Sequence, residues 1–73
     1  MFENISMNYH YSDNTFLGVS CYKDGLPYFI PNDSTNIDYQ EILDEIIANG
    51  TTNFKTGETI ATALQQDVDN KKA

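Results

Sequence analysis

The sequence predicts an α+β fold, in which one amphipathic helix covers a small three-stranded antiparallel meander and a C-terminal arm or short second helix follows. Three observations lead to this prediction. Apolar side chains alternate with polar ones near the start, an Asp-Gly pair separates two later apolar runs, and a helical repeat of apolar residues comes next. We expect residues 1–50 to form the small α+β domain and residues 51–73 to form the C-terminal arm.

The three strands are expected at about 5–11, 16–22 and 26–30. In the first of these, apolar or aromatic side chains stand at every second position, which is typical of a half-buried strand. Asp24-Gly25 suits a tight hairpin turn, because both residues tolerate positive φ. Pro27 has no amide proton, so the third strand should be short or lie at an edge of the sheet.

The helix is expected at about 38–49. Asp38 suits the N-cap, Glu41 stands three residues later as a capping box requires, and Ile37 and Ile42 fit a hydrophobic staple. The apolar residues that define one helical face are Tyr39, Ile42, Leu43, Ile46 and Ile47.

The C-terminal arm carries a weaker helical pattern. Gly50 is expected just past the end of the first helix. Residues 58–69 are predicted as a possible second helix, because Ile60, Leu64 and Val68 fall at helical spacing. We expect the apolar residues to be too few for a sheet and a helix together, so that self-association or a partner completes the core.

Composition excludes several classes of function. The chain has 73 residues, and its 11 acidic and 4 basic residues give a net charge of −7. With no Arg and few Lys, binding to nucleic acid through its phosphates is disfavoured, as is attraction to an anionic membrane. The single Cys21 excludes an intrachain disulfide. We expect no signal peptide and no membrane-spanning segment, since no long apolar run is present.

Two residues that often carry catalysis have ordinary interpretations here. His10 is the only His, and no nucleophile or orienting acid stands in a recognisable motif with it. Cys21 lies within an apolar strand, where Cys usually behaves as a small hydrophobe. We therefore expect no enzymatic activity and no cofactor.

The oxygen-bearing side chains of the middle segment also have structural interpretations. Asp33, Asn36 and Asp38 supply oxygen atoms that a hard cation could use, but the spacing and glycine of a calcium loop are absent and these residues commonly cap turns and helices. Glu41 and its neighbours Asp44 and Glu45 are expected on a solvated helix face. No metal site is predicted.

The aromatic residues exceed what one buried sheet face needs. A second aromatic face would be an exposed patch, which suggests a docking surface as readily as it suggests core packing. The C-terminal stripe is a second candidate for such contacts. The residues expected at a partner interface are Tyr9, Tyr11, Phe16, Tyr22, Tyr28, Ile60, Leu64 and Val68.

The segment from Ile30 to Thr51 resembles a recurrent pattern of small tailed-bacteriophage proteins, which reads roughly Ile-Pro-x-Asp-x-x-Asn-x-Asp-Tyr followed by a Leu-containing helix. The positions that match are Ile30, Pro31, Asp33, Asn36, Asp38, Tyr39, Leu43 and Thr51. Ile42 and Glu45 stand where the pattern has Tyr and Trp, and its Gly-Asn is inverted as Asn49-Gly50. The pattern occurs in tail assembly chaperones, tail-fibre assembly proteins and small virion proteins.

The resemblance implies a phage protein that binds other phage proteins, and it implies no catalytic residue. We therefore expect a non-enzymatic structural or assembly protein, located in the virion or the host cytoplasm. Its partners would be other phage structural proteins or a second copy of itself. The alternative is an acidic phage inhibitor, or nucleic-acid mimic, that blocks a host protein, which the net charge of −7 suggests.

Overall fold

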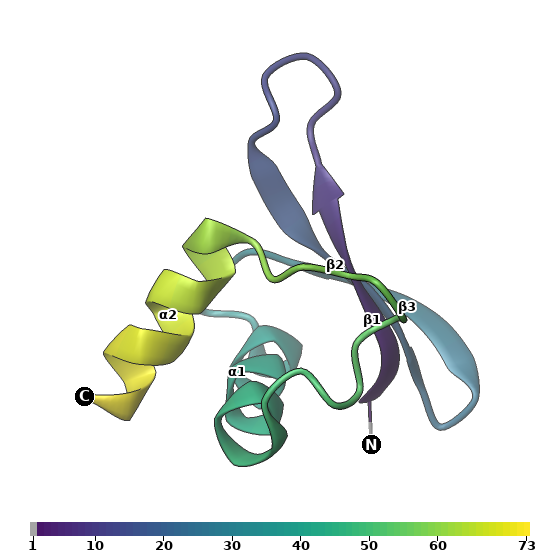
Figure 1. The fold of residues 1–73 in the computed structure, drawn as a ribbon, viewed down its shortest axis with the longest axis vertical. Helices are drawn as coiled ribbons and strands as arrows, with labels where there is room; N and C mark the ends of the chain where they lie inside the picture. Colours follow the sequence, from purple (N-terminus) through teal and green to yellow (C-terminus); the bar gives the residue numbers. More distant parts are fainter. Residues whose placement is uncertain (1) are drawn as a thin grey trace.

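The computed structural model describes residues 2–73 as an α+β fold of three antiparallel strands in one open sheet and two helices (Figure 1). In chain order, the elements are β1 (Phe2–Tyr9), β2 (Phe16–Lys23), β3 (Leu26–Pro31), α1 (Ile37–Asn49) and α2 (Thr62–Lys72). The sheet order is β1-β2-β3, so β3 is an edge strand as Pro27 predicts. The expected meander and its covering helix are confirmed.

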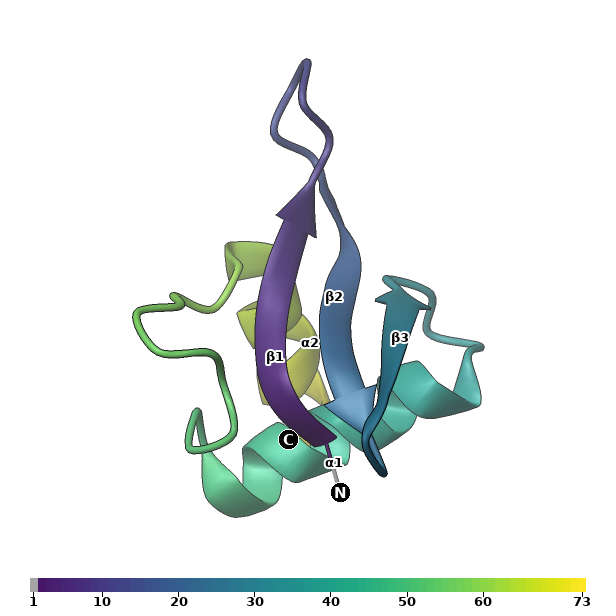
Figure 2. The same ribbon diagram turned by 90° about the vertical axis from the view of Figure 1, so that its right-hand side faces the viewer.

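Both helices lie on the same side of the sheet, and the opposite face, which we call the outer face, carries no helix (Figure 2). The β1–β2 hairpin extends beyond the helices and ends in a projecting loop (Figure 1). One hydrophobic core fills the space between the two layers and draws on every element, through Ile5, Val19, Ile30, Ile42 and Leu64.

Two irregularities in the β1–β2 pairing decide which side chains face the core. The register shifts once between Glu3 and Ser6 and again where Asn8 and Tyr9 meet β2. Each shift inserts one extra residue on one strand and so reverses the alternation of faces. The second shift places Phe16 on the buried side together with Val19. Phe16, expected at a partner interface, is therefore a core residue, and that prediction is wrong.

The start of α1 differs from the predicted cap. The N-cap is Asn36, whose side-chain oxygen accepts a hydrogen bond from Tyr39 N at 3.0 Å. Asp38 instead lies within the first turn, 3.6 Å from Lys23 Nζ on β2. Ile37 is exposed, so the predicted hydrophobic staple is wrong. Gly50 ends the helix at a φ of 63°, as expected.

Helix α2 closes the core. It begins and ends later than the predicted 58–69, and its Leu64 and Val68 are 0% and 1% exposed. These two residues, predicted to contact a partner, instead contact the core of their own chain. Ile60 is half-buried against the same core. The expectation that the core needs a partner to complete it is wrong, because α2 provides the missing cover.

A polar contact inside this packing joins the two helices. The hydroxyl of Tyr39 on α1 donates a hydrogen bond to Asp67 Oδ2 on α2 at 2.5 Å. The ring of Tyr39 is fully buried, so the ring fills the core while its hydroxyl makes the polar contact.

The core does not divide at residue 50, where the expected domain ends and the expected arm begins. Ala61, Leu64 and Val68 belong to the same core cluster as the buried residues of 2–50.

The segment between the helices covers the free edge of β1. Ile5 N donates to Asn53 O at 3.1 Å and Lys55 N donates to Ile5 O at 2.9 Å. A little further along, Met7 N donates to a carboxylate oxygen of Glu58. The amides of Ile5 and Met7 on this edge are thus satisfied within the chain, whereas no such segment pairs with the outer edge of β3.

Candidate protein-docking surface

The open edge carries the largest run of exposed apolar residues. Leu26, Pro27, Tyr28 and Phe29 are consecutive and all exposed, although they form most of a strand. We call these four residues the β3 strip. Leu26 is 58% and Phe29 54% exposed. Isolated apolar residues are normal on a surface, but a continuous run on both faces of one strand is typical of an interaction site.

Tyr22 extends this apolar surface across the outer face. It pairs directly with Pro27 and is 46% exposed. The neighbouring row of the sheet pairs Phe29 with Ser20, and Ser20 with Ser6. Because directly paired residues share a face, the outer face is apolar along β3 and becomes polar toward β1.

The backbone of β3 is protected against pairing with another strand. Lys23 and Leu26 flank a two-residue hairpin turn and form a hydrogen-bonded pair. Every second residue of β3 from Leu26 onward therefore directs its backbone groups toward β2, and the residues between them direct theirs away from β2, toward the open edge. Pro27 and Pro31 occupy two of these outward positions, and proline has no amide proton. Between them only Phe29 presents an outward amide. This edge is thus poorly suited to the addition of another strand, and its exposed groups are mainly side chains.

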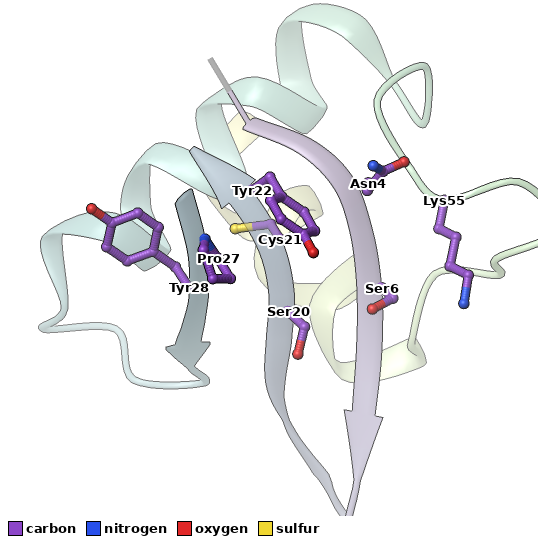
Figure 3. A pocket seen from close by; sticks show the side chains of 8 residues that line it. All are labelled: Asn4, Ser6, Ser20, Cys21, Tyr22, Pro27, Tyr28 and Lys55. Atoms are coloured by element: carbon purple, nitrogen blue, oxygen red, sulfur yellow. The ribbon is translucent and has the colours of Figure 1, made fainter. Parts of the chain in front are cut away.

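A shallow hollow of about 480 Å³ lies on the outer face beside the β3 strip (Figure 3). Figure 3 shows β1 and the loop of Lys55 on one side of the hollow and β3 on the other, with Tyr22 and Ser20 between them. The residues that line it are Asn4, Ser6, Ser20, Cys21, Tyr22, Pro27, Tyr28 and Lys55.

The predicted interface residues are dispersed by the fold. Tyr22 and Tyr28 lie beside the hollow, and both are exposed. Tyr9 and Tyr11 are also exposed, but they belong to the projecting β1–β2 hairpin. There Tyr11 stacks on His10 with ring centroids 5.0 Å apart. The structure therefore groups only two of the predicted residues around the β3 strip.

Two residues of the β3 strip, Leu26 and Phe29, were not among the predicted interface residues. The signal that could have identified them is the spacing of Pro27 and Pro31, which marks an edge strand that no neighbour covers.

The residues around His10 do not form a catalytic arrangement. Ser12 Oγ lies 2.7 Å and Asp13 Oδ1 3.6 Å from the same ring nitrogen, His10 Nδ1. A nucleophile, base and orienting acid need the two ring nitrogens for different partners. The three residues are exposed in one tight turn, where such contacts stabilise the turn itself.

The thiol of Cys21 is poorly suited to nucleophilic chemistry. Burial raises its pKa, and the nearby carboxylate of Asp38 raises it further. A thiol with a raised pKa remains protonated near neutral pH and is a weak nucleophile. Across residues 2–73, no group of three or more His, Cys, Asp or Glu residues is arranged to hold a metal ion.

The carboxylates are spread over the molecule and take part in local contacts. Asp33 accepts hydrogen bonds from Thr35, which lower its pKa, and Glu45 accepts one from Asn49. Asp44 lies 2.9 Å from Lys71 Nζ. The acidic residues thus stabilise turns and helix contacts in several elements.

No protein-family model, curated protein or solved structure matches this chain. Within the described residues, neither helix has the length and apolar character needed to cross a membrane.

Proposed function

We propose that this chain is a non-enzymatic protein-binding module, a bacteriophage structural or assembly protein that docks on other phage proteins. The observation that carries the proposal is the β3 strip, an exposed apolar strand on a domain whose core is already complete. The phage setting rests on the resemblance of residues 30–51 to small tailed-phage proteins.

The size of the apolar surface indicates what kind of contact it supports. An aromatic side chain can bury about 150–250 Å². The half-exposed residues of the β3 strip and Tyr22 therefore offer an area on the order of 400 Å², against about 800 Å² per partner in a standard stable interface. A stable partner would have to reach beyond the strip, and the adjoining hollow is the nearest surface that it could use.

These properties favour a different protein over a second copy of this chain. Two copies, each with a net charge of −7, repel one another. The proline-protected edge also removes the simplest route to self-association, which is strand pairing. An acidic inhibitor or nucleic-acid mimic has less support, because many of the carboxylates already have partners within the chain: Asp38 and Glu41 lie near Lys23, Asp44 near Lys71, and Asp67 accepts from Tyr39.

Photo-cross-linking tests the proposal. Benzoylphenylalanine would replace Phe29 in one variant and, as a matched control, Tyr11 in another, since Tyr11 is 94% exposed on the projecting hairpin. Each variant would be produced during infection by the phage that encodes the protein. We expect one discrete adduct with a phage structural protein from position 29 and none from position 11. Absence of an adduct at position 29, or the same adducts from both positions, would contradict the proposal.

A further inference from the structure

The hollow on the outer face is lined by hydrogen-bond donors and by no carboxylate. None of its eight lining residues is acidic, although the chain contains 11 Asp and Glu residues. A second, smaller hollow between the helices, of about 280 Å³, includes Asp67 among its lining residues. The outer hollow is thus a local exception to the acidic character of the chain.

Lys55 gives this hollow its charge. Lys23 lies 3.6 Å from Glu41 and Lys71 lies 2.9 Å from Asp44, so these two lysines are paired with acidic residues of α1. No ion pair within 4.0 Å joins Lys55 to a carboxylate of residues 2–73. The cation is therefore available to an acidic group from another molecule.

The backbone fixes Lys55 beside the hollow. Its amide donates to Ile5 O at 2.9 Å, and Ile5 N donates to Asn53 O at 3.1 Å. These two bonds attach the loop to β1 in the manner of a short parallel strand. A site on anchored backbone presents its charge more reproducibly than one on a free loop.

The neutral lining residues add donors beside this cation. Ser20 Oγ accepts a hydrogen bond from Asn8 Nδ2 at 2.7 Å, which leaves its own proton to donate elsewhere. Ser6 lies in the next position across the sheet. Asn4, at a φ of 51° within the first register shift of β1, carries its amide on the Lys55 side (Figure 3). Carboxylate oxygens accept several hydrogen bonds at once and match this arrangement.

The opposite side of the hollow is apolar. Pro27 and the ring of Tyr22 lie between the donors and the rest of the β3 strip (Figure 3). A ligand that satisfies both sides carries a carboxylate next to an apolar group. An acidic side chain beside an aromatic or aliphatic one on a protein segment has this chemistry.

We propose that the hollow receives an acidic side chain of the docking partner, held by Lys55 and its neighbouring donors, while an adjacent apolar side chain packs on Tyr22 and Pro27. This inference rests on the proposed function, because it specifies the partner segment that meets the docking surface. It implies that the partner is recognised by a local positive site despite the net charge of −7.

Two short peptides test this inference by amide chemical-shift titration of the whole protein. N-acetyl-Phe-Glu-amide carries the carboxylate, and N-acetyl-Phe-Gln-amide is its neutral isostere. Salt at about 0.15 M would limit the long-range repulsion to about 8 Å. We expect the Glu peptide to bind about three- to fivefold more tightly, as for an exposed ion pair, with the largest shifts at Ser6, Ser20 and Lys55.

The variant K55Q should remove the difference between the peptides. The variant K72Q makes the same change of charge at the exposed C-terminus and should preserve the difference. Equal affinity of the two peptides for the natural sequence, shifts located elsewhere, or a preference that survives K55Q would overturn the inference. None of these outcomes would affect cross-linking from position 29, so the proposed function and this inference fail independently.

Discussion

The apolar residues of α2 are buried and those of the β3 strip are exposed, which is the reverse of what their sequences suggest. Helix α2 is a short, polar element near the C-terminus, yet its Leu64 is 0% exposed. The β3 strip is four consecutive apolar residues in the middle of the domain, yet Phe29 is 54% exposed. The more hydrophobic segment is thus the more exposed one.

The difference in exposure arises from what packs against each element. Helix α2 lies beside α1 and against the sheet, so even a thin stripe is covered completely (Figure 2). Strand β3 has a neighbour on one side only, and both helices lie on one face of the sheet. Periodicity identifies an apolar face, but topology decides whether the chain itself covers that face.

The largest predicted effect contrasts two leucines. Leu64→Ala removes a fully buried side chain and should lower the free energy of unfolding by about 2 to 5 kcal/mol. Domains have about 0.05 to 0.15 kcal/mol of stability per residue, so this loss would remove a large part of the total. The same substitution at the exposed Leu26 should change it by no more than about 0.5 kcal/mol. Urea unfolding followed by circular dichroism measures both, and similar losses would refute the contrast.

A glycine in β2 allows the backbone of β3 to approach closely. Gly18 has a φ of +151°, and a Cβ there would lie 2.2 Å from Ile30 O and 2.9 Å from Pro31 Cα. Gly18→Ala should therefore destabilise the protein by about 3 kcal/mol, through a backbone clash and a strained φ. Gly57 has a φ of +83° with no atom within 4 Å of such a Cβ, so Gly57→Ala reports strain alone, about 1 kcal/mol. Equal losses in thermal unfolding would show that no close approach exists at Gly18.

The hydrogen bond between the helices should contribute less. Tyr39→Phe keeps the buried ring and removes the donor to Asp67, which should cost about 1.5 to 3 kcal/mol as for a bond to a charged group. Tyr11→Phe, on the exposed hairpin, is the matched control and should have no measurable effect. If the two variants have the same urea midpoint, the hydrogen bond between Tyr39 and Asp67 does not contribute to stability.

The same tyrosine predicts a dependence on pH. Burial raises the pKa of Tyr39 above its ordinary value of 10.0, and the hydrogen bond to Asp67 raises it further. The unfolded chain therefore ionises first as the pH rises. The contribution of Tyr39 is complete below pH 10 and is lost above it, by about 1.4 kcal/mol per pH unit.

Unfolding measured from pH 8.5 to pH 11 should show a smaller fall in Tyr39→Phe than in the natural sequence. Glu41 raises the pKa of Lys23, which therefore also loses its contribution at high pH, but Lys23 is present in both proteins and cancels in the comparison. Parallel pH curves would contradict the raised pKa of Tyr39.

The edge prolines should limit the association of one chain with another. Replacing Pro27 and Pro31 by Val supplies outward amides on β3, which other chains could pair with. The free energy of unfolding should fall by about 1 to 2 kcal/mol, because the unfolded chain gains conformational freedom at both positions. Size-exclusion chromatography should reveal larger oligomers than the natural sequence forms. A double variant that remains as dispersed as the natural protein would show that the prolines do not protect this edge.

The fold class could be predicted because its signals are local. Asp24-Gly25 specifies the hairpin, alternation specifies the strands, and the spacing from Tyr39 to Ile46 specifies α1. The N-cap could not be assigned from local signals, because Asn36 and Asp38 are both good N-cap residues; in the structure Asn36 accepts the hydrogen bond from Tyr39 N.

The candidate docking surface could be predicted only in part. Tyr22 and Tyr28, both expected at an interface, are exposed beside the β3 strip, whereas Phe16 is a core residue because a register shift reverses its face. Lys55 could not be placed, since its position depends on a loop that pairs with β1 far away in sequence. Such contacts follow from tertiary packing and leave no periodic signal.

The most direct test of the account combines two readouts on one variant, Phe29→Ser. We predict that its free energy of unfolding stays within about 0.5 kcal/mol of the natural value, because Phe29 lies outside the core. We also predict that it no longer captures the partner that cross-links at position 29. A loss of stability of about 2 kcal/mol or more, or capture that persists unchanged, would show that the β3 strip is not the docking surface.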